Sequence, residues 1–161
     1  MLENLCKYWY YRGITEVRFT MKISTKGRYA LRMLLDLAQN QDEGFIALKD
    51  VAKRQGISQK YLEQIVMLMG KSGILQSSRG YQGGYRLARK PESVTVGEVL
   101  QLTEGSLAPV TCLQGEVNEC ERCDECDMLR VWTGLEKVIY DYLDGITLAD
   151  IPRGAPEKCG G

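Results

Sequence analysis

Two short amphipathic segments meet at a tight turn near Gly56, and this junction constrains the fold more than any other part of the chain. Apolar residues recur at helical spacing over 47–54, and Gly56 can take the left-handed conformation that ends a helix. Ser58 then offers an N-cap oxygen to a second helix, over 58–72. Two helices joined by a short glycine-bearing turn predict a helix-turn-helix.

The segments on either side of this junction predict a further helix and a β-hairpin. Apolar residues follow a helical period over 25–40, and two strand-like segments, 74–77 and 84–87, flank the glycine-rich stretch 78–83. Glycine permits positive φ at a hairpin turn, so this stretch predicts a wing with Arg79 near its tip. The expected fold class is mainly α with a small β-hairpin wing.

The remaining pattern divides the chain into consecutive segments. Thr95 and Glu98 have the spacing of a capping box and predict a short connecting helix. We expect a leader that lies upstream of a native start at Met21, a winged helix-turn-helix domain, a connecting helix, a cysteine-rich loop, a long dimerisation helix with a docking segment, and a flexible tail. Their ranges are 1–20, 21–90, 91–105, 106–127, 128–151 and 152–161.

A narrow apolar stripe along the last predicted helix indicates a partner surface. Its residues follow one another at the a/d spacing of helices that pack together. Packing on the chain's own domain is the alternative, but a small domain offers little spare surface, so we expect a homodimer. The predicted contacts are Met128, Trp132, Leu135, Ile139 and Tyr142.

Charge is distributed unevenly along the chain, although 21 basic and 21 acidic residues cancel overall. Residues 21–90 carry 13 Lys and Arg against 5 Asp and Glu, whereas residues 91–161 carry 5 against 14. A basic first half favours a polyanionic partner, with nucleic acid as the main candidate. A solvated charged face is the alternative.

The outer face of the second helix of the helix-turn-helix suits the major groove of DNA, which is about 12 Å wide and admits a helix. Gln can bind adenine, Lys guanine or phosphate, and Glu cytosine or a neighbouring side chain. Arg79 at the wing tip suits a minor groove, and nearby cations, Lys71 among them, can contact phosphates. The predicted contacts with an operator in double-stranded DNA are Lys26, Arg28, Ser58, Gln59, Lys60, Tyr61, Glu63, Gln64 and Arg79.

Four cysteines fall within 15 residues of a chain that has no histidine: Cys112, Cys120, Cys123 and Cys126. Thiolates at such spacings bind an iron–sulfur cluster or tetrahedral zinc. Redox sensing through the thiols is a further alternative. An electron carrier is the alternative from another class of protein, and the Cys-x-x-Cys-x-x-Cys run is its only support.

Other functions lack their sequence signals. A Ser-His-Asp or Cys-His arrangement needs a histidine, and the glycine-rich stretch 79–84 lacks the Lys-Ser/Thr of a phosphate-binding loop. No apolar run approaches the roughly 18 residues of a membrane span, and residues 1–20 lack the apolar centre of a secretory signal. We therefore expect no enzymatic activity, no small-molecule substrate, no membrane contact and a cytoplasmic location.

Three motifs closely resemble the Rrf2 family of bacterial winged-helix regulators. They are Met-Lys-Ile-Ser-Thr-Lys-Gly-Arg-Tyr-Ala-Leu-Arg from Met21, Gln-Gly-Ile-Ser-Gln-Lys-Tyr-Leu-Glu-Gln from Gln55, and Ser-Arg-Gly-Tyr-Gln-Gly-Gly-Tyr from Ser78. The cysteine loop makes the chain similar to the iron–sulfur cluster regulators within that family. The resemblance extends to about residue 151. It implies a homodimer with crossed long helices, operator binding through the recognition helix and wing, and a cluster that tunes repression of iron–sulfur assembly, redox or cysteine-metabolism genes.

The resemblance also implies roles for particular residues. The family's three cluster cysteines fall on Cys112, Cys120 and Cys126, its wing arginine on Arg79, and its recognition pair on Glu63 and Gln64. The spacing from the first to the second of these cysteines is two residues longer than in an iron–sulfur regulator of the family.

The position of the family's histidine ligand holds Leu129, which cannot bind a metal. Cys123 is the nearest substitute, while Glu121, Asp124, Glu125 or an oxygen ligand from the other subunit stay open. We expect an iron–sulfur cluster, with [2Fe–2S] as the first choice and [4Fe–4S] or zinc as alternatives.

Overall fold

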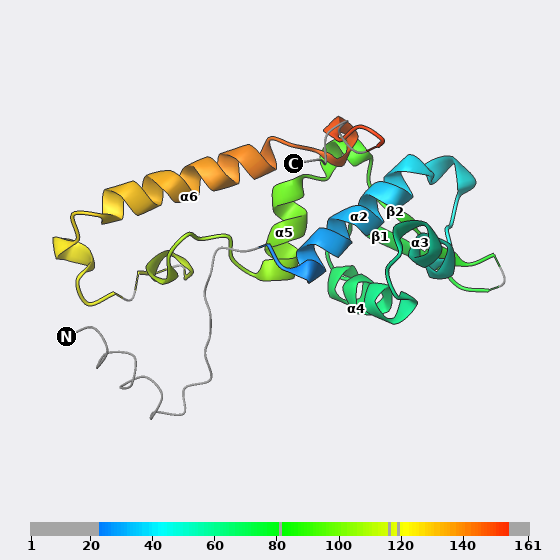
Figure 1. Ribbon diagram of the computed structural model, residues 1–161, viewed down its shortest axis with the longest axis horizontal. Helices are drawn as coiled ribbons and strands as arrows, with labels where there is room; N and C mark the ends of the chain where they lie inside the picture. Colours follow the sequence, from blue (N-terminus) through cyan, green and yellow to red (C-terminus); the bar gives the residue numbers. More distant parts are fainter. Residues whose placement is uncertain (1–22, 81, 116, 119, 155–161) are drawn as a thin grey trace, which may run out of the picture.

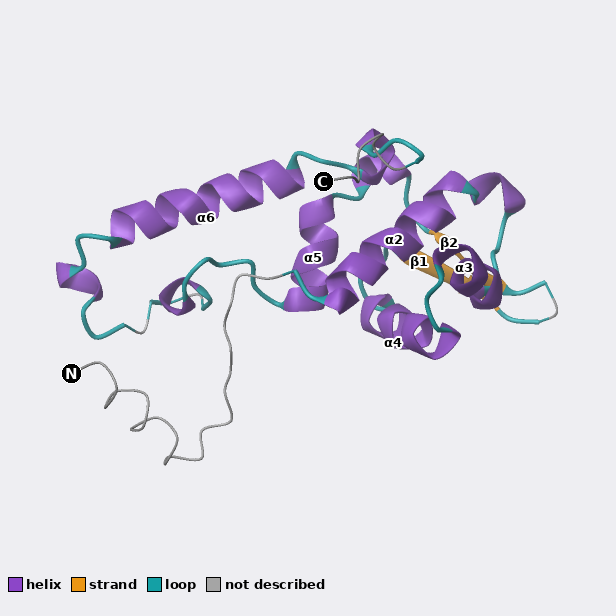
Figure 2. Ribbon diagram, viewed as in Figure 1, coloured by secondary structure: helices purple, strands orange, loops and turns teal. Residues whose placement is uncertain are grey.

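The computed structural model describes residues 23–80, 82–115, 117–118 and 120–154, and it has the expected mainly α fold with one β-hairpin (Figures 1 and 2). The predicted leader, Met21 and most of the predicted tail lie outside these residues. The helices and strands are α2 (Thr25–Gln39), α3 (Leu48–Gln55), α4 (Gln59–Met69), β1 (Leu75–Ser78), β2 (Gly84–Leu87), α5 (Val96–Glu104) and α6 (Leu129–Asp144). Single 3₁₀ turns lie at Gln41–Glu43, Pro91–Ser93, Thr111–Leu113, Cys123–Glu125 and Leu148–Asp150.

The junction between α3 and α4 is the helix-turn-helix that the sequence predicts. Gly56 has φ 63° and ψ 33°, the left-handed conformation that ends α3. Ile57 is buried in the core, and the Ser58 hydroxyl accepts the backbone N–H of Tyr61 at 3.3 Å. Helix α4 ends at Met69, three residues before the predicted end, because the Ser72 hydroxyl donates to the Met69 carbonyl at 2.8 Å and the chain turns away.

A single large core joins α2, α3 and α4, and it fixes the orientation of α4. Its fully buried side chains come mainly from the three helices and from the segment just before β1. They include Met33, Leu34, Leu37, Val51, Leu62, Ile65, Met69 and Ile74. Each such side chain contributes roughly 1.5–3 kcal/mol on burial, so the orientation of α4 is held firmly. We call residues 23–90, of which residue 81 is not described, the head.

The wing is a two-stranded antiparallel hairpin whose register runs from Leu75↔Leu87 to Ser78↔Gly84. The segment before α3 extends it, because Ile46 and Tyr85 exchange two backbone hydrogen bonds of 2.9 and 2.8 Å. Gly84 is required at this crossing, since a Cβ there would lie 2.3 Å from the Ile46 carbonyl oxygen. The wing is thereby attached to the body of the head.

Helix α6 extends away from the head, and the loop between α5 and α6 follows it outward (Figure 1). After α6 the chain returns and pairs with the segment before α5. The Val96 N–H donates to the Ile146 carbonyl at 2.8 Å, and the Leu148 N–H donates to the Val94 carbonyl at 2.9 Å. The Leu148 side chain then inserts into the core of the head. This return attaches the end of α6 to the head.

No helix within the described ranges is both long enough and apolar enough to cross a lipid bilayer.

Candidate DNA-binding surface and cysteine loop

The outward face of α4 carries most of the predicted base contacts. The opposite face is packed into the core through Leu62, Ile65, Val66 and Met69. Ser58, Gln59, Lys60, Glu63 and Gln64 are all exposed. The Gln59 Nε2 donates to the Glu63 Oε1 at 3.0 Å. This pair leaves Lys60 and Gln64 as the side chains of that face whose polar groups make no hydrogen bond to other described residues.

Tyr61 differs from the other predicted contacts because it is half-buried at the edge of the core. Its ring packs edge-on against the ring of Tyr29, with centroids 5.5 Å apart. The guanidinium of Arg32 lies over the Tyr29 ring, 5.5 Å from its centroid. Tyr61 therefore anchors α4 to α2, and its side chain is only partly accessible from the outer surface.

The predicted phosphate-binding cations lie around the recognition helix. Lys26 is half-buried and Arg28 is exposed in the first turns of α2, where the Arg28 guanidinium donates to the Thr25 hydroxyl at 3.0 Å. Lys71 and Arg79 are both exposed. The ion pairs between described residues join Arg54 to Asp36, Arg89 to Glu98 and Lys137 to Asp141, so they use none of these four cations.

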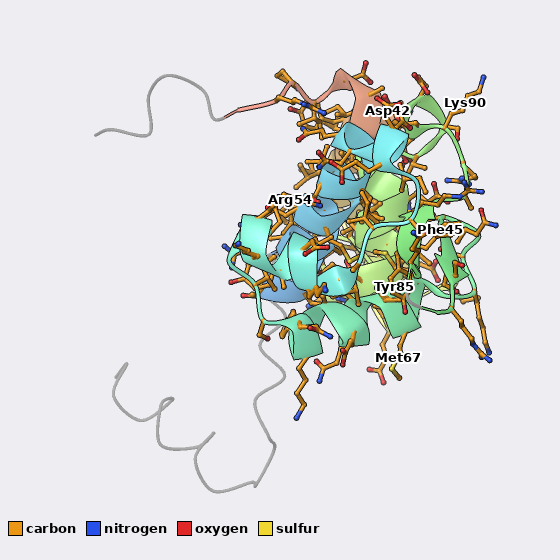
Figure 3. All side chains as sticks on the ribbon, turned by 90° about the vertical axis from the view of Figure 1, so that its right-hand side faces the viewer. Asp42, Phe45, Arg54, Met67, Tyr85 and Lys90 are labelled. Atoms are coloured by element: carbon orange, nitrogen blue, oxygen red, sulfur yellow. The ribbon has the colours of Figure 1, made fainter. Side chains whose placement is uncertain are left out.

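Arg86 is a further cation of the wing, and sequence reasoning missed it. Its guanidinium lies 4.5 Å from the centroid of the Phe45 ring, and its Nε donates to the Gln76 Oε1 at 3.0 Å across the hairpin. The Arg86 side chain is exposed, and Figure 3 shows Phe45 on the same side of the head as Tyr85 of β2. The sequence carried no signal for the contact with Phe45, because it depends on the pairing of Ile46 with Tyr85.

A buried carboxylate locks the helix-turn-helix to α2. Asp36 is 3% exposed and accepts from Arg54 Nε at 3.1 and 3.0 Å and from Arg54 Nη2 at 2.6 Å. The Gln55 side chain adds a fourth hydrogen bond of 2.9 Å. The hydrogen bonds to Asp36 raise the pKa of Arg54 above its ordinary value. This network fixes the angle between α2 and the end of α3, and hence the position of α4.

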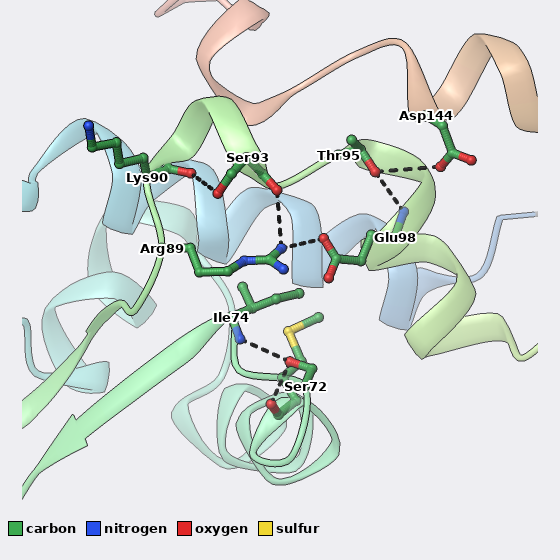
Figure 4. Close-up of polar contacts among 9 residues, drawn as sticks. Ser72, Ile74, Arg89, Lys90, Ser93, Thr95, Glu98 and Asp144 are labelled. Atoms are coloured by element: carbon green, nitrogen blue, oxygen red, sulfur yellow. Dashed lines mark hydrogen bonds and ion pairs between the residues drawn. The ribbon is translucent and has the colours of Figure 1, made fainter.

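Polar contacts connect the wing to the C-terminal half (Figure 4). Arg89, two residues beyond β2, forms an ion pair with Glu98 of α5 and donates to the Ser93 carbonyl at 3.2 Å. The Thr95 hydroxyl caps α5 by accepting the Glu98 N–H at 3.0 Å, and it donates to Asp144 at the end of α6 at 3.5 Å. A continuous set of contacts therefore joins the base of the wing to the end of α6.

The cysteine loop lies between α5 and α6, at the end of α6 that is far from the head (Figure 1). Cys112 and Cys123 are half-buried, Cys120 and Cys126 are exposed, and all four thiols are free. Among the described residues, no three cysteine, aspartate or glutamate side chains are gathered as ligands for one metal ion. Cys6 and Cys159 lie outside the described part of the chain.

The environment of Cys123 disfavours its thiolate form. Desolvation and the adjacent Asp124 carboxylate raise the pKa of the Cys123 thiol, whose sulfur lies 3.6 Å from the Asp124 Oδ1. The thiolate is the form that binds metals and attacks disulfides, so this environment disfavours the reactive form of Cys123. A bound cation has the opposite effect on a thiol pKa.

Helix α6 buries none of its residues completely. Met128, Leu135 and Tyr142 of the predicted dimer contact are exposed, and Trp132 is half-buried. Ile139 is half-buried as well, because it packs against the small cluster of Val96, Leu100 and Leu107 in its own chain. The exposed apolar side chains of this helix include Val131 and Val138, which the predicted dimer contact omitted. We call Met128, Val131, Leu135, Val138 and Tyr142 the apolar stripe.

The fold and this surface define a class. A helix-turn-helix with an exposed polar recognition face, a hairpin wing that carries cations, and a long helix outside the head are the parts of a winged-helix transcriptional regulator.

Residues 23–154 match the sequence model of the Rrf2 family, described as iron-dependent transcriptional regulators. The chain belongs to the Rrf2 family. It is 43% identical over 136 residues to the protein rrf2 of Nitratidesulfovibrio vulgaris, and the match covers 84% of this chain and 89% of rrf2. It is 39% identical over 131 residues to the regulator IscR of Aliivibrio salmonicida, covering 81% of this chain and 77% of IscR.

A solved structure supports the same assignment. The structure of CymR, described as the global cysteine regulator of B. subtilis, matches with a TM-score of 0.65 and 34% identity, covering 80% of this chain and 94% of CymR. The predicted family and fold class are confirmed. These relatives are named as transcriptional regulators, so the chain is a DNA-binding transcriptional regulator and not an enzyme. The electron-carrier alternative has no support among them.

Proposed function

We propose that the protein binds a twofold-symmetric operator as a homodimer, and that an iron–sulfur cluster in the cysteine loop modulates this binding in the cytoplasm. The observation that supports the regulatory part is the concentration of four free thiols in the single loop that joins α5 to α6. The proposed genes are those of iron–sulfur assembly, redox balance or cysteine metabolism, and the proposed mode is repression.

In the proposed complex, the outer face of α4 enters the major groove. Lys60 and Gln64 contact base edges, while Gln59 orients Glu63 through their hydrogen bond. Arg79 at the wing enters the adjacent minor groove. Two heads related by a twofold axis place their half-sites about 34 Å apart, one turn of the double helix.

Phosphate contacts position the head on the duplex. Lys26, Arg28, Lys71 and Arg86 lie around α4 and the wing, and the ion pairs between described residues do not neutralise them. Each phosphate that a cation neutralises releases counterions, so the affinity falls steeply as salt rises.

A second copy of the chain covers the apolar stripe of α6. Five large apolar side chains at a/d spacing are exposed on this helix, and exposure of such a stripe to water is unfavourable. A symmetric contact between two α6 helices places the two heads on one face of the duplex, as a palindromic operator requires.

The chemistry of the loop fits an iron–sulfur cluster. Cys112, Cys120 and Cys126 are the proposed ligands, with Cys123 as the fourth, and soft thiolates select iron–sulfur clusters or zinc. The loop must gather its thiols to bind either one, since they are not gathered in the described conformation. When bound, a cluster supplies a charge that changes on oxidation or reduction. The loop 106–127 becomes ordered when its cysteines bind the cluster. This ordering biases how the two heads of the dimer are positioned relative to each other.

Thiol-based redox sensing is a second candidate function. It is favoured by the match to CymR, whose description names it as a cysteine regulator, and by the exposure of Cys120 and Cys126. In this alternative the loop forms a disulfide and no cluster is needed.

Anaerobic purification tests the cofactor directly. We expect a coloured protein with iron and sulfide in equal amounts, and Cys112→Ala should lose the visible absorption while keeping the helical circular dichroism of the wild type. Cys159→Ala, outside the loop, is the matched control and should keep its colour. A colourless protein with one zinc per chain would replace the cluster by a structural metal. A Cys112→Ala protein with full colour would exclude that ligand.

A further inference from the structure

Met67 is the most exposed of the large apolar side chains in the described part of the chain, at 79%. It belongs to α4, and Figure 3 shows it directed away from the body of the head, at the lower edge of the helix. None of the predicted DNA contacts included it. A single exposed apolar residue is common on protein surfaces, but Met67 lies on the surface that defines the function of this protein.

The position of Met67 around the helix axis is set by the residues that are buried. Successive residues of an α-helix are separated by about 100°. The buried residues of α4 are Leu62, Ile65, Val66 and Met69. Met67 therefore lies within about 30° of the direction opposite to their centre. Around the helix axis Lys60 lies about 20° and Gln64 about 60° from Met67, about two turns and one turn closer to the start of the helix.

An apolar group at this position matches one feature of the major groove. The C5-methyl group of thymine is the apolar group that base pairs present there, and apolar side chains recognise it by contact. Methionine suits such a contact because its unbranched thioether is flexible and polarizable. Lys60 and Gln64 end in polar groups that bind to base edges by hydrogen bonds, whereas the Met67 side chain is apolar to its end.

We propose that Met67 contacts the C5-methyl group of one thymine in each operator half-site and thereby helps to determine which sequence is bound. The proposal rests on the proposed binding of DNA through α4. Met67 lies about 10 Å beyond Lys60 along the helix axis, a distance of about three base pairs. Helix α4 therefore lies along the groove over most of its length, and the recognised thymine is displaced from the bases that Lys60 contacts.

Replacement of thymine by deoxyuridine tests the contact, because it removes only the methyl group. An operator is first selected from random duplexes with the wild-type dimer, and each thymine is then replaced in turn. We expect one position per half-site at which the wild-type affinity falls about threefold to fourfold, the effect of losing one buried methyl group. Met67→Gln should bind the thymine and deoxyuridine duplexes equally at that position.

Leu68→Gln is the matched control. Leu68 is the neighbouring apolar residue of α4 and is 43% exposed, but it points about 100° away around the helix. This variant should keep the wild-type response to deoxyuridine. The proposal is overturned if no thymine position responds in the wild type, or if Met67→Gln keeps the wild-type response. Failure of the wild-type protein to select any sequence would instead overturn the proposed operator binding.

Discussion

At the scale of single residues, Arg86 shows how distant parts of the chain prepare one side chain for binding. Arginine loses rotamer freedom when it binds a phosphate, and this loss reduces the affinity. Phe45 and Gln76 hold the Arg86 guanidinium before any DNA arrives, through a ring contact at 4.5 Å and a hydrogen bond at 3.0 Å. The Arg86 side chain therefore loses less conformational entropy when its terminal nitrogens contact a phosphate.

Arg86→Ala is expected to weaken operator binding and to reduce the salt dependence of the affinity by about one phosphate contact per subunit. Phe45→Leu should cause a smaller loss, about twofold to fivefold, because an exposed cation–π contact contributes about 0.5–1 kcal/mol. Fluorescence anisotropy at several salt concentrations measures both quantities, with Arg79→Ala as a comparison at the wing tip. An unchanged salt slope in Arg86→Ala would remove this residue from the DNA interface.

The contrast between Arg79 and Arg86 shows what sequence can predict at this scale. Arg79 was identifiable because glycines around it mark a hairpin tip. The role of Arg86 depends on Phe45, which lies 41 positions earlier and is brought near by the Ile46–Tyr85 pairing. No local pattern records such a contact. Met67 was left out of the predicted DNA contacts for a different reason. The helical period places it on the outer face of this helix, but its apolar side chain offers no hydrogen bond to a base edge.

At the scale of elements, the attachment of α6 to the head depends on a capped 3₁₀ turn. Asp150 accepts hydrogen bonds from the Thr147 N–H at 2.8 Å and from the Thr147 hydroxyl at 2.6 Å. These two bonds hold the turn that follows α6, and Leu148 within that turn is buried in the core of the head. The same two bonds lower the pKa of Asp150.

Asp150→Asn is expected to reduce the free energy of unfolding near neutral pH. A carboxylate whose pKa is lowered by folding contributes stability above its unfolded pKa of about 3.9, and this contribution is lost as the pH falls through the lower folded value. The difference between variant and wild type should therefore be constant from about pH 5 to 7 and shrink below pH 4. Urea unfolding at several pH values measures it. Asp42→Asn, in the 3₁₀ turn Gln41–Glu43, is the control; a difference that did not change with pH would contradict this role.

Local signals predicted the elements well, whereas the faces of α6 were harder to assign. Glycine and cap residues located the helix-turn-helix to within three residues because their effects act over one turn. On α6, two adjacent apolar lines both have a/d spacing. The one that includes Ile139 packs partly on its own chain, and Val131 and Val138 extend the exposed one. Periodicity alone cannot distinguish them, since the distinction depends on where α5 lies.

At the scale of the whole molecule, basic charge is concentrated at one end, while acidic charge and exposed apolar surface are concentrated at the other. The basic head faces the proposed operator, while the acidic half carries the cysteine loop and the apolar stripe. Helix α6 connects them and lies apart from the head in Figure 1. In the proposed dimer, a second copy covers the stripe and supplies the second head that a palindromic site requires.

Val138→Glu is expected to weaken the proposed dimer at least tenfold, because Val138 is 63% exposed within the apolar stripe and an unpaired charge there becomes buried on association. Operator affinity should fall with it. Sedimentation velocity over a range of concentrations measures the dimer, and Thr133→Glu places the same charge on another side of α6 as a control. An unchanged dimer in Val138→Glu would show that another surface joins the subunits.

The return of the chain after α6 makes this helix a lever with one fixed end. The Ile146 and Leu148 backbone bonds hold the end near the head, while the end at Leu129 adjoins the cysteine loop. A helix of 16 residues is about 24 Å long. A shift of about 4 Å at the cysteine end therefore turns α6 by roughly 10° about its pivot. The pivot includes Asp144, whose contact with Thr95 leads to Glu98, Arg89 and the base of the wing.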